Sequence, residues 1–141
     1  MVYFTSSVQV FWAHEILEGA THSLRMQSNN PLLLHKTTQR KIYDLAWQKA
    51  VSLGGFDALF INERGELTEG GRTSIFVRPH HSDEWLTPPL SAGVLPGVLR
   101  SSILRNPALK AREANLTIDD VIGANEIMLS NALRGMIKAH L

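Results

Sequence analysis

The stretch from residue 56 to residue 87 constrains the fold more than any other part of the sequence, because it predicts several strands joined by short turns. In "FDALFINERGELTEGG", apolar residues at positions 56, 58 and 60 alternate with other residues, and "NERG" supplies the residues of a turn. This pattern is typical of a β-hairpin. A further strand is expected over residues 73–78 and a short one over residues 84–87. A sheet should therefore form the centre of the fold.

Three segments predict helices. Apolar residues recur at helical spacing over residues 38–53, with a Thr-Thr pair available as the cap and a Gly-Gly pair ending the run. In "VLPGVLRSSILRN", Pro96 stands where the first turn of a helix tolerates proline. "LTIDDVIG" places Thr117 three residues before Asp120, which is the spacing of a capping box, and predicts a short helix that ends near Gly123.

Strands are also expected elsewhere in the chain. Residues 8–13 are rich in β-branched and aromatic side chains, and three leucines at 32–34 form an apolar run just before the first predicted helix. "EIMLSNALRGMIKAHL" predicts a strand, a turn and a second strand. The mixed order of helices and strands, without an internal repeat, predicts a single α/β domain over residues 1–141 whose sheet curls toward a barrel.

Length and charge limit the possible partners. A chain of 141 residues has the size of one domain, and 14 basic against 13 acidic residues leave no broad basic surface for nucleic acid or an anionic membrane. The absence of cysteine excludes a disulfide framework and a thiolate metal site, and fits a cytoplasmic protein. No segment approaches the roughly 18 apolar residues of a membrane span, and the first residues lack the layout of a signal peptide. We therefore expect the partner to be a small molecule or another protein.

Three stretches contain residues that could carry chemistry. They are Lys36 after the leucine run, "LTEGGRTS" with Glu69, and "GVLPGVLR", in which a glycine precedes a helix. Each has an ordinary structural explanation, although a helix start with glycine also offers N–H groups and partial positive charge to a phosphate. "PHHSDE" suggests a metal site, but two adjacent histidines cannot easily face one ion, so we favour a solvated turn.

Together, an amine, a carboxylate and an anion-binding helix start are the groups that a pyridoxal 5'-phosphate site needs. The lysine forms a Schiff base with this cofactor, and the carboxylate keeps the pyridine nitrogen protonated, so that the ring withdraws electrons. The helix start binds the phosphate. The combination of the three stretches therefore predicts this cofactor.

Four ordered motifs resemble those of the fold-type IV (class IV) pyridoxal-phosphate enzymes: "HKTTQRKIYD", "GFDALFINERGELTEGGRTSIFV", "WLTPPLSAGVLPGVLR" and "LSNALRG". Within that class they are most similar to aminodeoxychorismate lyases, notably those fused to the synthase component of 4-aminobenzoate synthesis. The resemblance covers roughly residues 32–141. It implies the large domain of the D-amino-acid-aminotransferase-like fold, in which helices flank a curled mixed sheet.

The resemblance also implies roles for individual residues. Lys36 would be the catalytic residue that forms the Schiff base, and Glu69 would meet the pyridine nitrogen. The phosphate would be bound by backbone groups of Gly97, Val98 and Leu99 and by a hydroxyl of Thr73 or Ser74. The substrate side would be lined by Ser130, Asn131 and Ala132.

The implied reaction converts 4-amino-4-deoxychorismate into 4-aminobenzoate and pyruvate, a step of folate synthesis. Two alternatives stay open: a class IV transaminase of branched-chain or D-amino acids, and a non-catalytic truncated domain that acts as a scaffold.

Whole enzymes of this class carry a small N-terminal domain, for which the 35 residues before Lys36 are too few. We therefore interpret residues 1–31 as a remnant of the interdomain region. We expect a homodimer. Three alternatives stay open for the site: the chain is a fragment of a longer polypeptide that includes the N-terminal domain, a partner chain such as the synthase component completes the site, or the cleft lies open.

Overall fold

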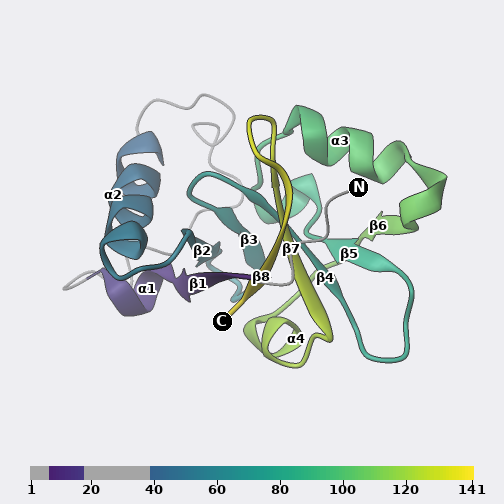
Figure 1. The fold of residues 1–141 in the computed structure, drawn as a ribbon, viewed down its shortest axis with the longest axis horizontal. Coiled ribbons are helices and arrows are strands. Elements are labelled where there is room, and N and C mark those ends of the chain that lie inside the picture. Colours follow the sequence, from purple (N-terminus) through teal and green to yellow (C-terminus); the bar gives the residue numbers. More distant parts are fainter. Residues whose placement is uncertain (1–6, 18–38) are drawn as a thin grey trace.

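The computed structural model describes residues 7–17 and 39–141, which form one eight-stranded sheet with flanking helices (Figure 1). The strands are β1 (Val8–Trp12), β2 (Asp57–Ile61), β3 (Leu67–Gly70), β4 (Ser74–Arg78), β5 (Trp85–Thr87), β6 (Ala111–Glu113), β7 (Glu126–Asn131) and β8 (Gly135–His140). The α-helices are α1 (Ala13–Ile16), α2 (Gln39–Ser52), α3 (Val98–Arg105) and α4 (Ile118–Ile122), and two short 3₁₀ helices are η2 (Leu90–Ala92) and η3 (Pro107–Leu109). The predicted α/β fold with a mixed sheet is confirmed.

The strand order β3-β2-β1-β8-β7-β4-β5-β6 requires the sheet to curl. Only residues 71–73 join β3 to β4, yet four other strands lie between them in the sheet. In a flat sheet these two strands would lie about 24 Å apart, whereas a three-residue link spans at most about 14 Å. The sheet therefore bends until β3 approaches β4, which is the curl that the sequence predicted.

β1 connects the two parts of this sheet. It pairs in parallel with β2, where Phe11 lies opposite Ala58, and in parallel with β8, where Val8 lies opposite Ala139. β7 lies between β4 and β8 and pairs with each of them in antiparallel fashion. Their register places Ser74 of β4 opposite Ser130 of β7, so two residues predicted for the site are neighbours across the sheet.

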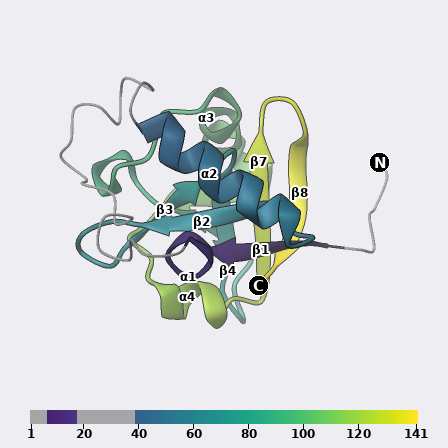
Figure 2. The ribbon, with the colours of Figure 1, turned by 90° about the vertical axis from the view of Figure 1, so that its left-hand side faces the viewer.

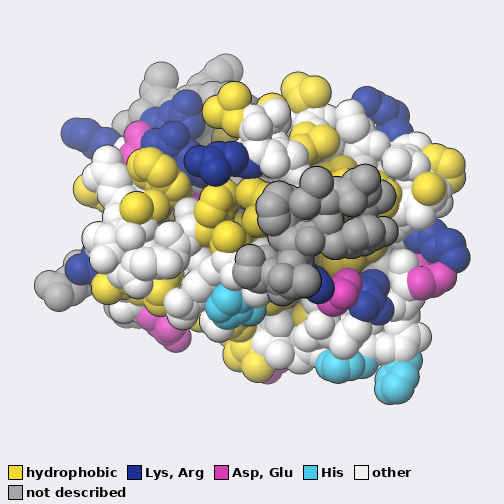
Figure 3. Space-filling model, viewed as in Figure 1, with side chains coloured by type: hydrophobic (Ala, Val, Ile, Leu, Met, Phe, Trp, Pro, Cys, Tyr) yellow, Lys and Arg dark blue, Asp and Glu magenta, His cyan; other side chains and the backbone are white. Residues whose placement is uncertain are grey.

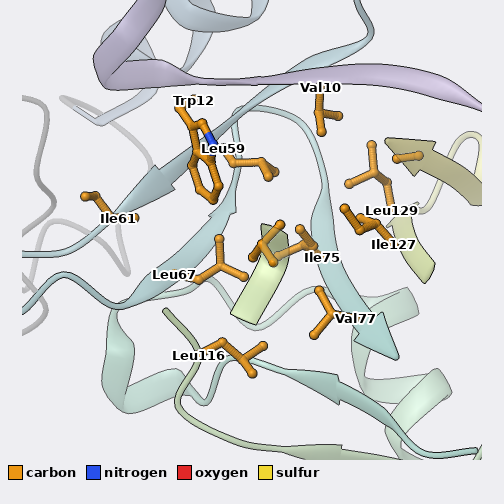
Figure 4. Packing of buried hydrophobic residues seen from close by; sticks show 12 residues of the cluster. Val10, Trp12, Leu59, Ile61, Leu67, Ile75, Val77, Leu116, Ile127 and Leu129 are labelled. Carbon is orange, nitrogen blue, oxygen red and sulfur yellow. The ribbon is translucent and has the colours of Figure 1, made fainter. Parts of the chain in front are cut away.

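The main hydrophobic core lies inside the curl (Figure 4). Alternate residues of each strand point inward, as expected for a pleated strand. The core consists of fully or nearly fully buried apolar side chains: Val10, Trp12, Leu59, Ile61, Leu67, Ile75, Val77, Leu116, Val121, Ile127, Leu129 and Ala139.

α2 packs on the other face of β2 (Figure 2). Ala46 and Ala50 are completely buried there, and their small side chains let the helix approach the sheet closely. The ring centroids of Tyr43 and Phe60 lie 4.7 Å apart in the same cluster. β2 is thus buried on both faces, and α2 presents Tyr43 to the interior.

Most of the predicted elements are confirmed, and two local differences have simple causes. The strand predicted over residues 8–13 ends at Trp12, and Ala13 instead begins the short helix α1. β6 was not predicted, because it is a short, mostly exposed strand of small and charged residues, which lies at the end of the described sheet next to β5. The leucine strand predicted at residues 32–34 lies outside the described residues.

The capping box predicted before α4 is present. Thr117 Oγ1 accepts a hydrogen bond from the backbone N–H of Asp120 at 3.3 Å, and the Asp120 carboxylate accepts one from the N–H of Thr117 at 2.8 Å. This reciprocal pairing fixes the start of a helix that is only five residues long. None of the helices in the described part of the chain is long and apolar enough to cross a membrane.

Candidate active site

A cavity of about 440 Å³ is built around the connection between β3 and β4. Four segments line it: the first turns of α2, residues 69–74, residues 95–100 and residues 130–132. Every predicted site residue that the structure describes lines this one cavity: Glu69, Thr73, Ser74, Gly97, Val98, Leu99, Ser130, Asn131 and Ala132. Lys36 lies outside the described residues; in the sequence it stands four positions before Arg40, which lines the cavity.

Glu69 is the buried acid of the cavity, with only 5% of its surface exposed. The Tyr43 hydroxyl donates a hydrogen bond to Oε2 at 2.9 Å, and the backbone N–H of Leu95 donates to Oε1 at 3.3 Å. Burial raises the pKa of Glu69 from 4.5 to about 7, although these two hydrogen bonds oppose the rise. The carboxyl can therefore hold or release a proton near neutral pH.

Tyr43 serves as a neutral donor in this pair. Burial raises the pKa of its hydroxyl above the ordinary value of 10, and the nearby Glu69 carboxylate raises it further. The hydroxyl thus keeps its proton and donates a hydrogen bond to Glu69. Because Tyr43 belongs to α2 and Glu69 to β3, this hydrogen bond links the helix to the strand beside the cavity.

Asp57 holds the turn that follows Glu69. This side chain is completely buried at the start of β2, and its carboxylate accepts hydrogen bonds from the N–H groups of Gly71 at 3.1 Å and Arg72 at 2.9 Å. It also accepts the Thr73 hydroxyl at 2.8 Å and the N–H of Ala58 at 2.8 Å. Burial raises the pKa of Asp57, and these four hydrogen bonds lower it. One buried acid thus shapes the link between β3 and β4.

The Gly-Gly pair of this turn is explained by close approach to Asp57. A Cβ atom on Gly70 would collide with the Asp57 carboxylate and the Thr73 hydroxyl. A Cβ on Gly71 would lie 2.6 Å from the carbonyl oxygen of Tyr43, too close for any side chain. Larger residues would therefore push the turn away from the acid that holds it.

The start of α3 contributes backbone donors. Gly97 is the N-cap residue, has an extended conformation, and provides no side-chain hydrogen bond to the first turn. The N–H groups of the first turn of a helix have no partners within the helix, and the helix dipole makes this end partly positive. Residues 97–100 line the cavity, so this part of the lining suits an anionic group.

Ser130 adds a hydroxyl with no partner of its own. The residue is 1% exposed, and its Oγ makes no hydrogen bond within the described part of the chain. A buried hydroxyl without a partner is costly, so it favours a ligand that supplies one. Ser74, opposite Ser130 in the sheet, lines the same cavity and lies near Gly97.

Arg100, in the first turn of α3, forms hydrogen bonds to two neighbouring segments. Its guanidinium is 4% exposed and donates through Nη2 to the carbonyl oxygen of Pro88 at 2.9 Å and to the Glu113 carboxylate. The positive charge also lowers the pKa of Glu69, against the larger effect of burial. Arg100 therefore connects the first turn of α3 to β6 and to the loop after β5.

Sequence reasoning missed Tyr43, Asp57 and Arg100. Asp57 carries a usable signal, because an acid inside the apolar strand "FDALFI" must be hydrogen-bonded if the strand is buried. Tyr43 lies in the helical pattern of α2, and nothing in that pattern distinguishes it as a partner of Glu69. Arg100 cannot be distinguished in the sequence from an ordinary solvated arginine on a helix.

The two adjacent histidines, His80 and His81, are exposed in the turn between β4 and β5. Across residues 7–17 and 39–141, no three His, Asp or Glu side chains come close enough together to hold a metal ion. The geometry at "PHHSDE" is therefore that of a surface turn.

Comparisons with known proteins identify a family that matches this chain. The profile of the family described as "Amino-transferase class IV" matches residues 4–141. The Schizosaccharomyces pombe protein named "Putative aminodeoxychorismate lyase" is 30% identical over 141 residues, an alignment that covers 90% of this chain and 58% of that protein.

Solved structures give the same fold. A crystal structure titled "Putative amino-acid aminotransferase", from Mesorhizobium loti, has a TM-score of 0.79 and 34% identity, and the match covers 97% of this chain and 60% of that one. A structure titled "Putative 4-amino-4-deoxychorismate lyase", from Legionella pneumophila, has a TM-score of 0.78 at 22% identity, with coverage of 99% and 49%. The chain thus spans about three fifths of the length of the S. pombe and M. loti proteins.

Proposed function

Since this chain belongs to the aminotransferase class IV family, we propose that its cavity binds pyridoxal 5'-phosphate and that the chain acts as a 4-amino-4-deoxychorismate lyase. The reaction breaks the carbon–oxygen bond between the ring and the enolpyruvyl group, and gives 4-aminobenzoate and pyruvate. The relative from S. pombe named for this lyase supports the choice of substrate.

The observation that carries the proposal is the pairing of two unlike groups in one cavity. Glu69 offers a buried carboxyl with a pKa of about 7, and the start of α3 offers backbone donors without a side-chain cap. A carboxyl of this kind suits a basic ring nitrogen, and the donors suit a phosphate. The unpartnered Ser130 hydroxyl gives the ligand a further contact. The residues present therefore fit this cofactor.

When bound, pyridoxal phosphate supplies a ring that withdraws electrons from the bonds of the substrate's amino-bearing carbon. Glu69 would hold a proton shared between its carboxylate and the ring nitrogen, and Tyr43 would keep that carboxylate in position. The N–H groups of Val98 and Leu99 and the Ser74 hydroxyl would bind the phosphate. The other two predicted groups already donate hydrogen bonds: the Gly97 N–H to the carbonyl oxygen of Leu95 at 2.9 Å, and the Thr73 hydroxyl to Asp57 at 2.8 Å. Ser130, Asn131 and Ala132 would border the substrate.

For Lys36 we propose covalent attachment of the cofactor and transfer of the proton at the reacting carbon. Its position in the sequence, four residues before Arg40 of the cavity lining, supports this role. An amine in a desolvated site has its charged form disfavoured, which makes it a better nucleophile near neutral pH.

The test of Lys36 uses reduction of the complex of protein and cofactor with borohydride, followed by mass spectrometry. We expect the reduced adduct on Lys36 in the wild type, and its loss in Lys36→Ala. Lys41→Ala is a matched control, because Lys41 is an exposed lysine at the start of α2 and should leave the adduct intact. An adduct that persists in Lys36→Ala and maps to Lys41 or Lys49 contradicts the assignment.

A class IV transaminase is the second candidate, favoured by the 34% identity to the M. loti protein. Product analysis separates the two functions. The lyase gives 4-aminobenzoate and pyruvate from 4-amino-4-deoxychorismate, whereas a transaminase transfers the amino group of a branched-chain or D-amino acid to a 2-oxo acid. A protein that binds the cofactor and catalyses neither reaction would fit the third reading, a non-catalytic scaffold.

We also propose that the chain forms a homodimer and that an N-terminal domain or a synthase component contributes to the complete enzyme. A two-fold pair is the commonest closed assembly of identical chains, which supports this proposal. Sedimentation of the full-length protein at micromolar concentration tests the dimer, and a monomer alone would contradict it.

A further inference from the structure

A second cavity, of about 560 Å³, adjoins the first one. The two share Arg72, Asn131 and Ala132 in their linings, so they meet along the turns after β3 and β7. The outer wall of the second cavity comes from α2 and from the β7–β8 hairpin. We call this second cavity the arginine cleft, because Arg72 and Arg134 line it and none of its lining residues in the described part of the chain is Asp or Glu.

Arg72 is held in the cleft by two contacts to α2. Its guanidinium carbon lies 4.3 Å from the centroid of the Trp47 ring, and Nη2 donates to Asp44 at 2.9 Å. Stacking on a ring fixes the plane of a guanidinium and leaves the N–H groups along its edge available for a carboxylate. Arg72 is thus oriented before any ligand arrives.

Arg134 is the less neutralised charge of the cleft. Its guanidinium carbon lies 5.9 Å from the centroid of the Phe56 ring, and no acidic side chain pairs with it within the described residues. Figure 3 shows dark blue Lys and Arg side chains gathered on the surface between α2 and the β7–β8 hairpin. This local positive charge contrasts with a net charge of only +1 for the whole chain.

Asn131 ties the two arginine-bearing segments together. Its side-chain amide donates to the carbonyl oxygen of Arg72 at 3.3 Å, and its Oδ1 accepts the N–H of Arg134 at 2.7 Å. One residue that lines both cavities therefore sets the backbone positions of both arginines. The arginine cleft and the first cavity are therefore connected through shared lining residues.

We propose that the arginine cleft binds a carboxylate of the substrate while the reacting part of that substrate lies in the first cavity. This inference rests on the proposed function. The ligand class is a cyclic carboxylate: its charge meets Arg134 and Arg72, and its ring lies against the apolar part of the lining, which includes Val51, Phe56 and Leu133. Charge-assisted contacts from arginine to carboxylate are the strong kind of hydrogen bond.

The first test uses isothermal titration of the full-length protein with isophthalate, and with its neutral diamide, isophthalamide, as the comparison. We expect isophthalate alone to bind, with affinity that falls as salt rises. Arg134→Gln should weaken binding about tenfold to a hundredfold, and Arg72→Gln should do so to a smaller extent because Asp44 already neutralises part of its charge. Arg134→Lys should restore part of the loss.

Arg105→Gln is the matched control, since it removes an exposed arginine from the last turn of α3, outside both cavities. Its affinity for isophthalate should equal that of the wild type. Equal binding by Arg134→Gln and the wild type, or equal binding of isophthalate and isophthalamide, overturns the inference.

The second test uses steady-state kinetics of 4-aminobenzoate formation. Arg134→Gln should raise KM at least tenfold and leave kcat nearly unchanged, because the contact is made equally in the ground state and the transition state. An unchanged KM overturns the inference while the lyase assignment stands. If the protein forms no 4-aminobenzoate but isophthalate binding still depends on Arg134, the lyase assignment fails and the carboxylate site stands.

Discussion

The surroundings of Glu69 and the start of α3 border the same cavity but are built in opposite ways. Around Glu69, the buried polar groups form hydrogen bonds within the protein. The Tyr43 hydroxyl and the N–H of Leu95 donate to the Glu69 carboxyl, and the Asp57 carboxylate accepts four hydrogen bonds. Around α3, the groups are left open, because the first turn has no side-chain cap and Ser130 Oγ has no partner among the described residues.

The groups around Glu69 find their hydrogen-bond partners within the fold, whereas the groups at the start of α3 need a ligand to supply partners. The part around Glu69 is complete without a ligand, so changes there should alter the folding free energy of the free protein. The part around α3 carries unsatisfied donors, so changes there should alter ligand affinity and leave folding nearly unchanged. The following predictions examine that separation.

The largest effect is expected for Asp57→Ala. The substitution leaves the N–H group of Arg72 and the Thr73 hydroxyl without their acceptor, and the Gly71 N–H keeps only its second acceptor, the carbonyl oxygen of Ala58 at 3.1 Å. We expect the free energy of unfolding of the cofactor-free protein to fall by about 4 kcal/mol, as measured by urea unfolding.

Thr68→Val provides the control for Asp57→Ala. Thr68 is equally buried on β3, but its hydroxyl donates only to the carbonyl oxygen of Phe60, at 3.0 Å. Its loss should cost about 1 kcal/mol. Equal losses in the two variants would mean that the turn does not depend on Asp57.

A smaller, pH-dependent effect is expected for Glu69→Gln. The pKa of Glu69 is raised from 4.5 to about 7 in the folded protein, so between these values the folded state binds the proton more tightly than the unfolded state. The stability of the wild type should therefore decrease as pH rises through this window, by about 3 kcal/mol from this group. Glu69→Gln should lack this contribution. Urea unfolding at several pH values measures the difference, and parallel curves for the two proteins would contradict it.

The smallest effect on folding is expected for Ser130→Ala, on the open side of the comparison. The hydroxyl has no partner among the described residues, so the free energy of unfolding should change by less than about 0.5 kcal/mol. The affinity for pyridoxal phosphate, followed by visible absorbance, should fall by up to about tenfold. Ser102→Ala, an exposed change on α3, should alter neither quantity. A large loss of folding stability in Ser130→Ala would contradict the proposed difference between the surroundings of Glu69 and the start of α3.

The regular elements could be predicted because their patterns are local. The period of α2, the "NERG" turn and the capping box of Thr117 each act within a few residues, and the structure confirms them. The curl of the sheet follows from strand order, which single-sequence patterns do not state. It was predicted from the mixed order of elements and from the resemblance of four motifs.

The candidate site could be predicted in part for a similar reason. Glu69, Ser74 and Gly97 lie in short motifs whose composition is unusual for plain structural turns. The partners that hold them come from distant elements: Tyr43 lies 26 positions from Glu69, and Asp57 lies 16 positions from Thr73. Such pairings depend on tertiary packing, which no local pattern in the chain records.

β1 lies between β2 and β8, and this position has a consequence for the order of folding. Next to β1, Ser7 Oγ contacts the His140 ring across 133 positions of sequence. Joining such distant segments costs chain entropy before any contact compensates for it. The hairpins β2–β3 and β7–β8 can form quickly, whereas β1 can pair on both of its sides only after β2 and β8 are both present. During synthesis on the ribosome, the "VQVFW" edge of β1 therefore stays unpaired on the β8 side until β8 emerges, and in that interval it is open to pairing with other nascent chains.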